Sequence, residues 1–178
     1  MTRLNAQRIA VIAVMAAIVT VFTLAVRVPI PGTPGYINFS DVAIFFTSLA
    51  FGPWIGGIAS GVGTALADLI GYPATAPLTF VAHGLEGLIA GWIAWRSKSL
   101  RRMLLAWLAG ALVMVALYFL GETAGFAGYT VPQAVAEAPF NILQAVAGGL
   151  LGIPLVYAVR RAYPPIDQIG QGRHWKEL

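Results

Sequence analysis

The chain has 178 residues, of which 58% are hydrophobic and only 10% are charged, and its formal net charge is +4. Soluble domains carry about 25% charged residues, so this composition leaves too few charges for a water-facing surface and excludes an ordinary soluble protein. Cysteine is absent, so neither a thiolate metal site nor a redox compartment can be inferred. We therefore expect helices that cross a lipid bilayer.

Six apolar segments follow one another along the chain. They cover about 8–28, 39–52, 54–71, 78–95, 103–121 and 135–159, and a short polar cytoplasmic tail follows at 160–178. The second segment is short for the roughly 20 residues that a span requires. The first is longer than a typical signal-peptide core and lacks a small-x-small cleavage site, so we expect it to remain as a helix. The sequence thus predicts an all-α integral membrane protein, with six transmembrane helices forming one domain over 1–178.

The basic residues give the orientation of these helices. Ten of them flank the first, fourth and sixth segments: Arg3, Arg8, Arg96, Lys98, Arg101, Arg102, Arg160, Arg161, Arg173 and Lys176. With six crossings all ten lie on one side, which the positive-inside rule makes the cytoplasm, and both termini are then cytoplasmic. Only Arg27 falls outside, where a ligand, Asp41 or a lipid headgroup could meet it. The basic excess therefore reflects topology, and we expect no nucleic-acid partner.

A ridge of small side chains runs along the first segment. Ala6, Ala10, Ala13 and Ala17 recur at helical spacing, and such ridges allow close helix packing in lipid. The ridge could pack inside the bundle or against another membrane protein, and its spacing alone leaves both possibilities open.

Polar side chains share faces of the later segments. The sets are Ser60, Thr64 and Asp68; His83 and Glu86; and Glu137, Asn141 and Gln144, with Glu122 at the end of the fifth segment. An ionisable residue at the centre of a membrane helix costs about 2.5–3.5 kcal/mol and usually faces a cavity or a partner. Any one of these residues could simply stabilise the bundle through a side-chain hydrogen bond, for example His83 to Glu86 or Glu137. The set as a whole favours a polar cavity toward the outer surface.

Signatures of catalysis are missing from the chain. The HGLE stretch at 83–86 is not the HExxH of zinc proteases, and neither a G-x-S-x-G motif nor a P-loop occurs. We therefore expect no catalytic residue, no metal site and no cofactor, and an ATP-driven transporter would need an ATPase from another chain. A small polytopic membrane enzyme, or a proton-coupled secondary transporter using the Glu/His/Asp cluster, is the alternative.

Four stretches resemble one family of membrane proteins. They read YINFSDVAIFFTSLAFGPWIGGIASGVGTALADLIGYP, HGLEGLIAGW, YFLGETAGFAGYT and APFNILQAVAGG, from residue 36 to residue 149. They are similar to the substrate-binding S component of energy-coupling factor (ECF) transporters, in the riboflavin-transporter-like group. The resemblance covers about residues 6–160.

The resemblance implies a vitamin-uptake subunit in the cytoplasmic membrane of a prokaryote. Such S components bind their ligand near the outer surface and dock onto a transmembrane T component that carries two ABC ATPases. Helices 4–6 and the loop after helix 1, here PIPGTPGYINFSD (29–41), would form the site. The family docks through an Ala-x-x-x-Ala ridge on helix 1, which matches Ala13 and Ala17, with Ala6 and Ala10 extending it. The expected substrate-binding residues are Tyr36, Asn38, Asp68, His83, Glu86, Glu122, Tyr129, Glu137, Asn141 and Gln144.

The charge of the expected site favours one class of ligand. Its carboxylates outnumber its one titratable His83 and the single outer cation, Arg27, and an uncompensated anion is costly in a low-dielectric site. We therefore expect a neutral or cationic heteroaromatic ligand. Thiamine, its pyrimidine precursors, pyridoxine-type compounds and riboflavin are favoured over pantothenate, folate and biotin.

Overall fold

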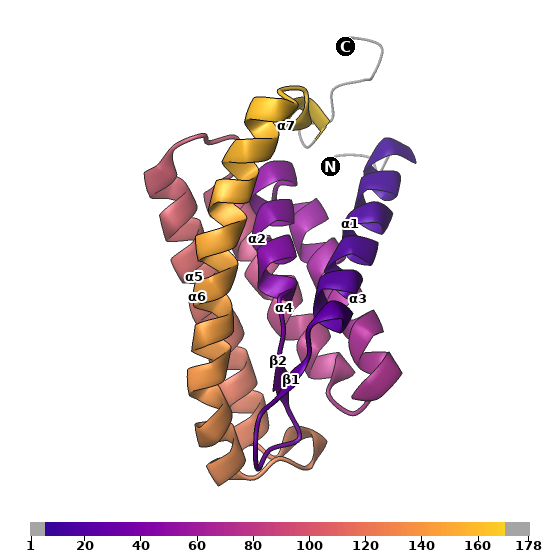
Figure 1. Ribbon diagram of the computed structural model, residues 1–178, viewed down its shortest axis with the longest axis vertical. Coiled ribbons are helices and arrows are strands. Elements are labelled where there is room, and N and C mark those ends of the chain that lie inside the picture. The colour runs from indigo at the N-terminus through magenta and orange to yellow at the C-terminus, as the bar shows by residue number, and fades with distance from the viewer. Residues whose placement is uncertain (1–5, 170–178) are drawn as a thin grey trace.

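Six long helices lie side by side in the computed structural model, which describes residues 6–169 (Figure 1). They are α1 (Ala6–Ala25), α2 (Ser40–Phe51), α3 (Pro53–Gly71), α4 (Ala76–Ile93), α5 (Leu100–Thr123) and α6 (Val131–Ala162). Five are long and apolar enough to cross a membrane, and α2 is a shorter apolar helix. The expected all-α membrane bundle of six helices is confirmed.

The connections between the helices differ from the sequence-based expectation in three places. Strands β1 (Val28–Pro29) and β2 (Tyr36–Ile37) pair antiparallel, so the segment after α1 is a small hairpin. A 3₁₀ turn, η1 (Phe126–Gly128), precedes α6. Helix α6 continues to Ala162, and a short helix α7 (Ile166–Ile169) follows it, so the stretch predicted as a polar tail from 160 is partly helical. Residues 170–178 of that tail lie outside the described residues.

Helix α2 lies inside the bundle and packs against α1, α3, α4 and α6. Apart from the half-buried Phe46, all of its residues are buried. A helix that is shielded from lipid on every side can be apolar all round and does not have to match the bilayer thickness. Gly52, with φ +85°, ends α2, and Pro53 begins α3 directly after it.

Glycines bring the central helices into close contact. A Cβ atom at Gly87 of α4 would lie 2.7 Å from the carbonyl oxygen of Gly56 in α3, and one at Gly91 would lie 2.7 Å from Pro53. At Gly148 of α6, an added Cβ would collide with Asp41 of α2. These contacts hold α2, α3, α4 and α6 at backbone distance, as small residues do in membrane bundles.

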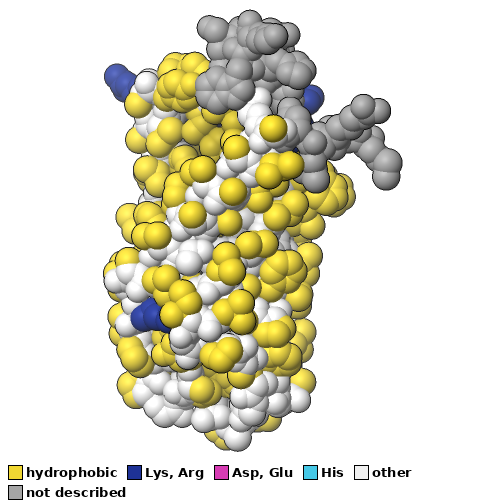
Figure 2. Space-filling view, turned by 90° about the vertical axis from the view of Figure 1, so that its right-hand side faces the viewer, with side chains coloured by type: hydrophobic (Ala, Val, Ile, Leu, Met, Phe, Trp, Pro, Cys, Tyr) yellow, Lys and Arg dark blue, Asp and Glu magenta, His cyan; other side chains and the backbone are white. Residues whose placement is uncertain are grey.

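Both ends of the described chain lie at the same end of the bundle (Figure 1). The start of α1, the α4–α5 loop, the start of α5 and the end of α6 lie there, and all the described basic residues except Arg27 lie on these segments. The hairpin lies at the opposite end. The face in Figure 2 is dominated by hydrophobic side chains, as expected for a surface in contact with lipid. Arg3, Arg173 and Lys176 of the expected cytoplasmic set lie outside the described residues.

The alanine ridge of α1 faces away from the bundle. Ala6, Ala10, Ala13 and Ala17 are all exposed, whereas Met15, Ala16, Val19 and Thr23 form the buried side of the helix. Packing inside the protein's own bundle therefore does not explain the ridge.

Candidate ligand-binding site

Asp68, near the outer end of α3, is the centre of a hydrogen-bond network. Its carboxylate accepts hydrogen bonds from the Tyr36 phenol and from the hydroxyls of Thr75 (3.0 Å) and Thr79 (2.6 Å). Tyr118 of α5 donates to Thr79 Oγ1 at 2.8 Å. The network therefore joins the hairpin to α3, α4 and α5 around one buried carboxylate.

Arg27, just after α1, supports the tyrosine of this network. Its Nη2 donates to the backbone oxygen of Ala67 at 2.6 Å, and its guanidinium carbon lies 4.8 Å and 5.3 Å from the ring centroids of Tyr36 and Tyr72. The two rings are 4.5 Å apart. Asp41, one of the three contacts that the sequence left open for Arg27, is not among these partners. Burial, followed by the negative charge of Asp68, raises the pKa of Tyr36 well above its ordinary value, and the phenol stays a hydrogen-bond donor.

Two α6 side chains bind the backbone of the hairpin segment. The amide of Gly35 donates to Glu137 Oε1 at 3.0 Å, and the amide of Asn38 donates to Gln144 Oε1 at 2.8 Å. Gln144 also donates through Nε2 to Asp41 Oδ1 at 2.8 Å. Residues 29–41, which the resemblance includes in the site, are thus fastened to α3 on one side and to α6 on the other.

His83 of α4 lies close to two buried acids, Asp41 of α2 and Glu86 of α4. Its Nδ1 is 2.8 Å from Glu86 Oε2 and 3.9 Å from Asp41 Oδ1, and all three residues are buried. Asp41 Oδ2 and Glu86 Oε1 are buried without a hydrogen-bond partner. The nitrogen and oxygen atoms of Asp41, His83 and Glu86 that could coordinate a metal ion lie within 4.8 Å of one another, so these residues could hold a cation between them. Because buried charge needs compensation, they favour a proton or a cationic group nearby.

A second acid pair lies at the outer ends of α5 and α6. Glu122 and Glu137 are both buried and repel each other electrostatically, and Glu122 Oε2 has no hydrogen-bond partner. Tyr129, in the loop between these helices, lies beside them. Burial, followed by the charge of Glu137, raises the pKa of this phenol above its ordinary value.

These groups enclose a cavity of about 40 Å³ beneath the hairpin. It is lined by Thr23, Pro34, Gly35, Tyr36, Asn38, Thr64, Asp68, Tyr72, Thr75, Thr79, His83, Tyr118, Tyr129, Glu137, Asn141 and Gln144. A cavity needs about 10–15 Å³ of space measured in this way to hold one water molecule. The cavity therefore has room for a few water molecules, and a ligand as large as a vitamin needs the hairpin to move.

The structure brings together eight of the ten residues predicted for the site. Glu86 and Glu122 are not on the cavity wall and lie behind His83 and Glu137. Eight lining residues were not in the predicted set: Thr23, Pro34, Gly35, Thr64, Tyr72, Thr75, Thr79 and Tyr118. Thr79 could have been predicted from the sequence, because it precedes His83 by four residues and lies on the same helix face. Tyr118 reaches the cavity through tertiary packing, which no local pattern reveals.

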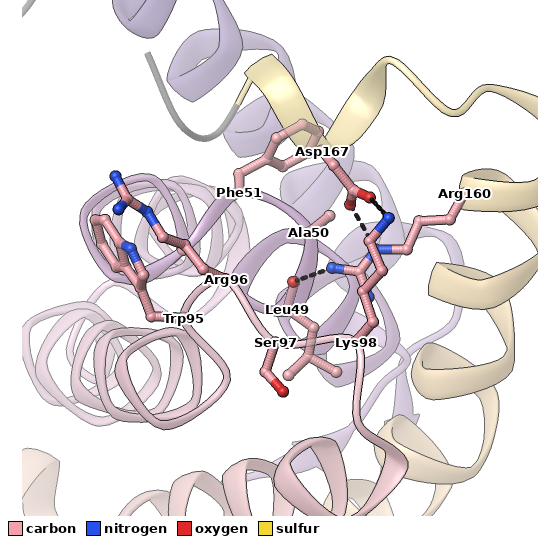
Figure 3. Close-up of a pocket in the computed structure, with 10 residues that line it drawn as sticks. Leu49, Ala50, Phe51, Trp95, Arg96, Ser97, Lys98, Arg160 and Asp167 are labelled. Atoms are coloured by element: carbon pink, nitrogen blue, oxygen red, sulfur yellow. Dashed lines mark hydrogen bonds and ion pairs between the residues drawn. The ribbon is translucent and has the colours of Figure 1, made fainter. Parts of the chain in front are cut away.

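The opposite end of the bundle holds an ion-pair cluster (Figure 3). Asp167 of α7 bonds to Lys98 Nζ at 2.7 Å and to Arg160 Nε at 2.8 Å. Arg160 also donates to the backbone oxygen of Leu49 at 3.1 Å. The cluster joins α7, α6, the end of α2 and the α4–α5 loop, and it fixes the cytoplasmic end of the bundle.

A helical membrane bundle with a polar cavity beneath a hairpin is typical of a membrane protein that binds a small solute. The family model for the ECF-type riboflavin transporter S component matches residues 3–161. The chain therefore belongs to the family of ECF-type riboflavin transporter S components. It is a multi-pass membrane protein and a substrate-binding subunit of a transporter, not the membrane enzyme weighed as an alternative.

Two solved structures and one relative are similar to this chain. A structure of the S component of a bacterial ECF transporter matches with a TM-score of 0.72 at 25% identity, over 88% of this chain and 96% of that one. The fold also matches FolT bound with folic acid, with a TM-score of 0.60 at 20% identity, over 89% and 95% of the two chains. A Pyrococcus woesei protein described as "Uncharacterized protein in gap 3'region" is 43% identical over 148 residues, which cover 83% of this chain and 98% of that protein.

Proposed function

We propose that this chain captures a vitamin or vitamin precursor in the cavity beneath the hairpin, from the outer side of a prokaryotic cytoplasmic membrane. A T component and two ABC ATPases would then drive its uptake. The observation that carries the proposal is the polar cavity at the end of the bundle opposite the described basic residues. Family membership supports the same role.

The charges around the cavity favour a ligand without negative charge. Asp68 and Glu137 line it, and no Lys or Arg of the described chain does. Arg27 is held outside by Ala67 and the two tyrosine rings. An anionic vitamin would therefore enter a low-dielectric site without a matching cation, which is costly. A neutral or cationic heteroaromatic compound with several donors fits better, and riboflavin, which the family's description names, belongs to this class.

Each predicted site residue takes a role in this proposal. Asp68, Glu137, Asn141 and Gln144 supply acceptors and amides for the polar edge of the ligand, and Tyr36 and Tyr129 supply aromatic walls. The backbone amide of Asn38 fastens the hairpin segment to Gln144 of α6. His83 faces the ligand, while Glu86 and Glu122 act as positioning residues behind the cavity wall. This division follows from which side chains line the cavity.

The α1 ridge is the proposed docking surface for the T component. Four exposed alanines on one helix face, Ala6, Ala10, Ala13 and Ala17, allow another membrane helix to approach closely. Co-purification of an ECF T component and its ATPases with the tagged chain from its host would test this partnership.

A calorimetric binding screen on the purified protein tests the ligand class. Riboflavin, thiamine and pyridoxine form one group, and folate, pantothenate and biotin form the other. We expect micromolar or tighter binding from the first group only, and about a tenfold loss for Glu137→Gln, which removes a charge-assisted contact. Asp167→Asn, the same change at the far end of the bundle, is the matched control and should bind as the wild type does. Micromolar binding of an anionic vitamin that Glu137→Gln leaves unchanged would overturn the proposed ligand class.

A further inference from the structure

An apolar groove runs along the outside of the bundle between α3 and α4. It consists of two adjoining hollows of about 590 Å³ and 330 Å³, which share Trp54 and Leu88. The first is also lined by Pro53, Trp92, Trp95 and Arg102, and the second by Gly57, Ile58, Phe80, Val81, Gly84 and Leu85. Neither the vitamin cavity nor the α1 ridge includes any of these residues.

The glycines of α3 and α4 form the floor of this groove. A Cβ atom at Gly57 would lie 3.1 Å from the carbonyl oxygen of Gly84, so the two backbones are nearly in contact. Large aromatic side chains rise on both sides and are exposed: Trp54 by 61%, Trp92 by 72% and Phe80 by 48%. A narrow apolar channel with a backbone floor and aromatic walls suits a flexible hydrocarbon chain.

The length and orientation of the groove match one leaflet of a bilayer. From Phe80 to Trp92, α4 rises by about 18 Å at 1.5 Å per residue, and half of a hydrocarbon core is about 15 Å thick. Trp54 and Trp92 lie toward the cytoplasmic ends of their helices, at the level where tryptophan prefers the membrane interface. The groove thus extends from the inner interface toward the middle of the membrane.

Arg102, near the start of α5, gives the cytoplasmic end of the groove a positive charge. No Asp or Glu of the described chain lines either hollow. A guanidinium group binds phosphate through paired hydrogen bonds. We propose that the groove binds one acyl chain of an anionic phospholipid of the inner leaflet, with Arg102 holding the phosphate of its headgroup.

Native mass spectrometry of the full chain in a mild detergent tests this lipid site. The protein is titrated with phosphatidylglycerol and phosphatidylcholine that carry identical acyl chains. We expect the wild type to retain severalfold more phosphatidylglycerol. Arg102→Gln should remove this preference, whereas Arg101→Gln, the same charge change one residue away and outside the groove, should keep it. Gly84→Leu fills the groove floor, where an added Cβ has no neighbour closer than 3.6 Å, and should lower the binding of both lipids.

Three results would overturn the lipid site. The first is equal retention of the two lipids by the wild type. The second is a preference that Arg102→Gln leaves intact or that Arg101→Gln removes to the same degree. The third is a dimer that Gly84→Leu abolishes, because the groove would then bind a second copy of the chain. None of these results bears on vitamin binding, which the calorimetric screen measures separately.

Discussion

Tyr36 of the hairpin donates its phenolic hydrogen to the buried carboxylate of Asp68 in α3. The same ring lies against the guanidinium of Arg27 and the ring of Tyr72. The hydrogen bond fastens the hairpin over a cavity that is too small for a vitamin in this state. A ligand must therefore enter while this bond is open, and the bond then re-forms to hold the hairpin over the bound ligand.

Tyr36→Phe should loosen the hairpin without removing its aromatic ring. A hydrogen bond to a charged group contributes about 1.5–3 kcal/mol, so we expect bound ligand to dissociate about tenfold faster or more. Stopped-flow measurement of dissociation checks this rate, and hydrogen exchange of the amides in 28–38 should rise in parallel. Tyr163→Phe, at the other end of the bundle, is the control. Unchanged dissociation and exchange in Tyr36→Phe would show that this bond does not hold the hairpin.

Gln144→Glu should lower stability, because it replaces an amide donor by a carboxyl group beside Asp41. Gln144 Nε2 now donates to Asp41 Oδ1 in a buried site. The loss of a buried partner costs about 1–3 kcal/mol, and repulsion between the two acids adds to this at neutral pH. Thermal unfolding in detergent should therefore show a lower midpoint at pH 7, and acidification should partly restore it.

Gln133→Glu is the matched control for that change. Gln133 is half-buried at the start of α6, where its side-chain oxygen accepts hydrogen bonds from Thr130 that a carboxylate can also accept. Only the exposed 3.3 Å bond that its Nε2 donates to Gly32 O is lost. Its midpoint should stay near that of the wild type. Equal midpoints for the two variants would contradict the role given to Gln144.

Ala13→Trp and Ala17→Trp should abolish transport while ligand binding by the isolated chain stays unchanged. Both alanines are exposed on the α1 ridge, and a bulky ring there prevents the close approach of a partner helix. Uptake assays and calorimetry separate the two effects. Leu112→Trp, at a position of α5 that is 70% exposed, should leave both unchanged. If ligand affinity falls together with transport, the docking role of the ridge is wrong.

The topology can be tested with single cysteines, because the chain has none of its own. Cysteine at Ala74 or Ala124, exposed in the α3–α4 and α5–α6 connections, should react with an impermeant thiol reagent on intact cells. Cysteine at Ser99, exposed before α5, should react only after the cells are opened. Labelling of Ser99 from outside would reverse the orientation.

Much of the bundle could be predicted because helices that cross a lipid bilayer need long apolar stretches, which are easy to recognise in a sequence. Apolar stretches, their Pro and Gly breaks and the basic clusters gave the helices and their direction. Helix α2 was the ambiguous segment, since burial inside the bundle removes the length constraint that a lipid-facing helix obeys. The paired strands escaped prediction, because β1 and β2 have two residues each and depend on tertiary tethers such as Gly35 to Glu137.

The site could be predicted in its chemistry more than in its geometry. Intramembrane polar residues are costly, so Asp68, His83 and Glu137 stood out by type and spacing. Which acids face the cavity and which lie behind it depends on helix rotation. Glu86, three residues after His83, turns away from the cavity that His83 lines. The position of Arg27 between two tyrosine rings also depends on contacts between segments far apart in the sequence.

Mass spectrometry of the small molecule that co-purifies with the detergent-solubilised protein tests the central claim most directly. The wild type should release one neutral or cationic heteroaromatic compound in near-stoichiometric amount. A variant carrying both Asp68→Asn and Glu137→Gln should release far less of it. Release of an anionic compound, or of the same amount of compound from both proteins, would contradict the account.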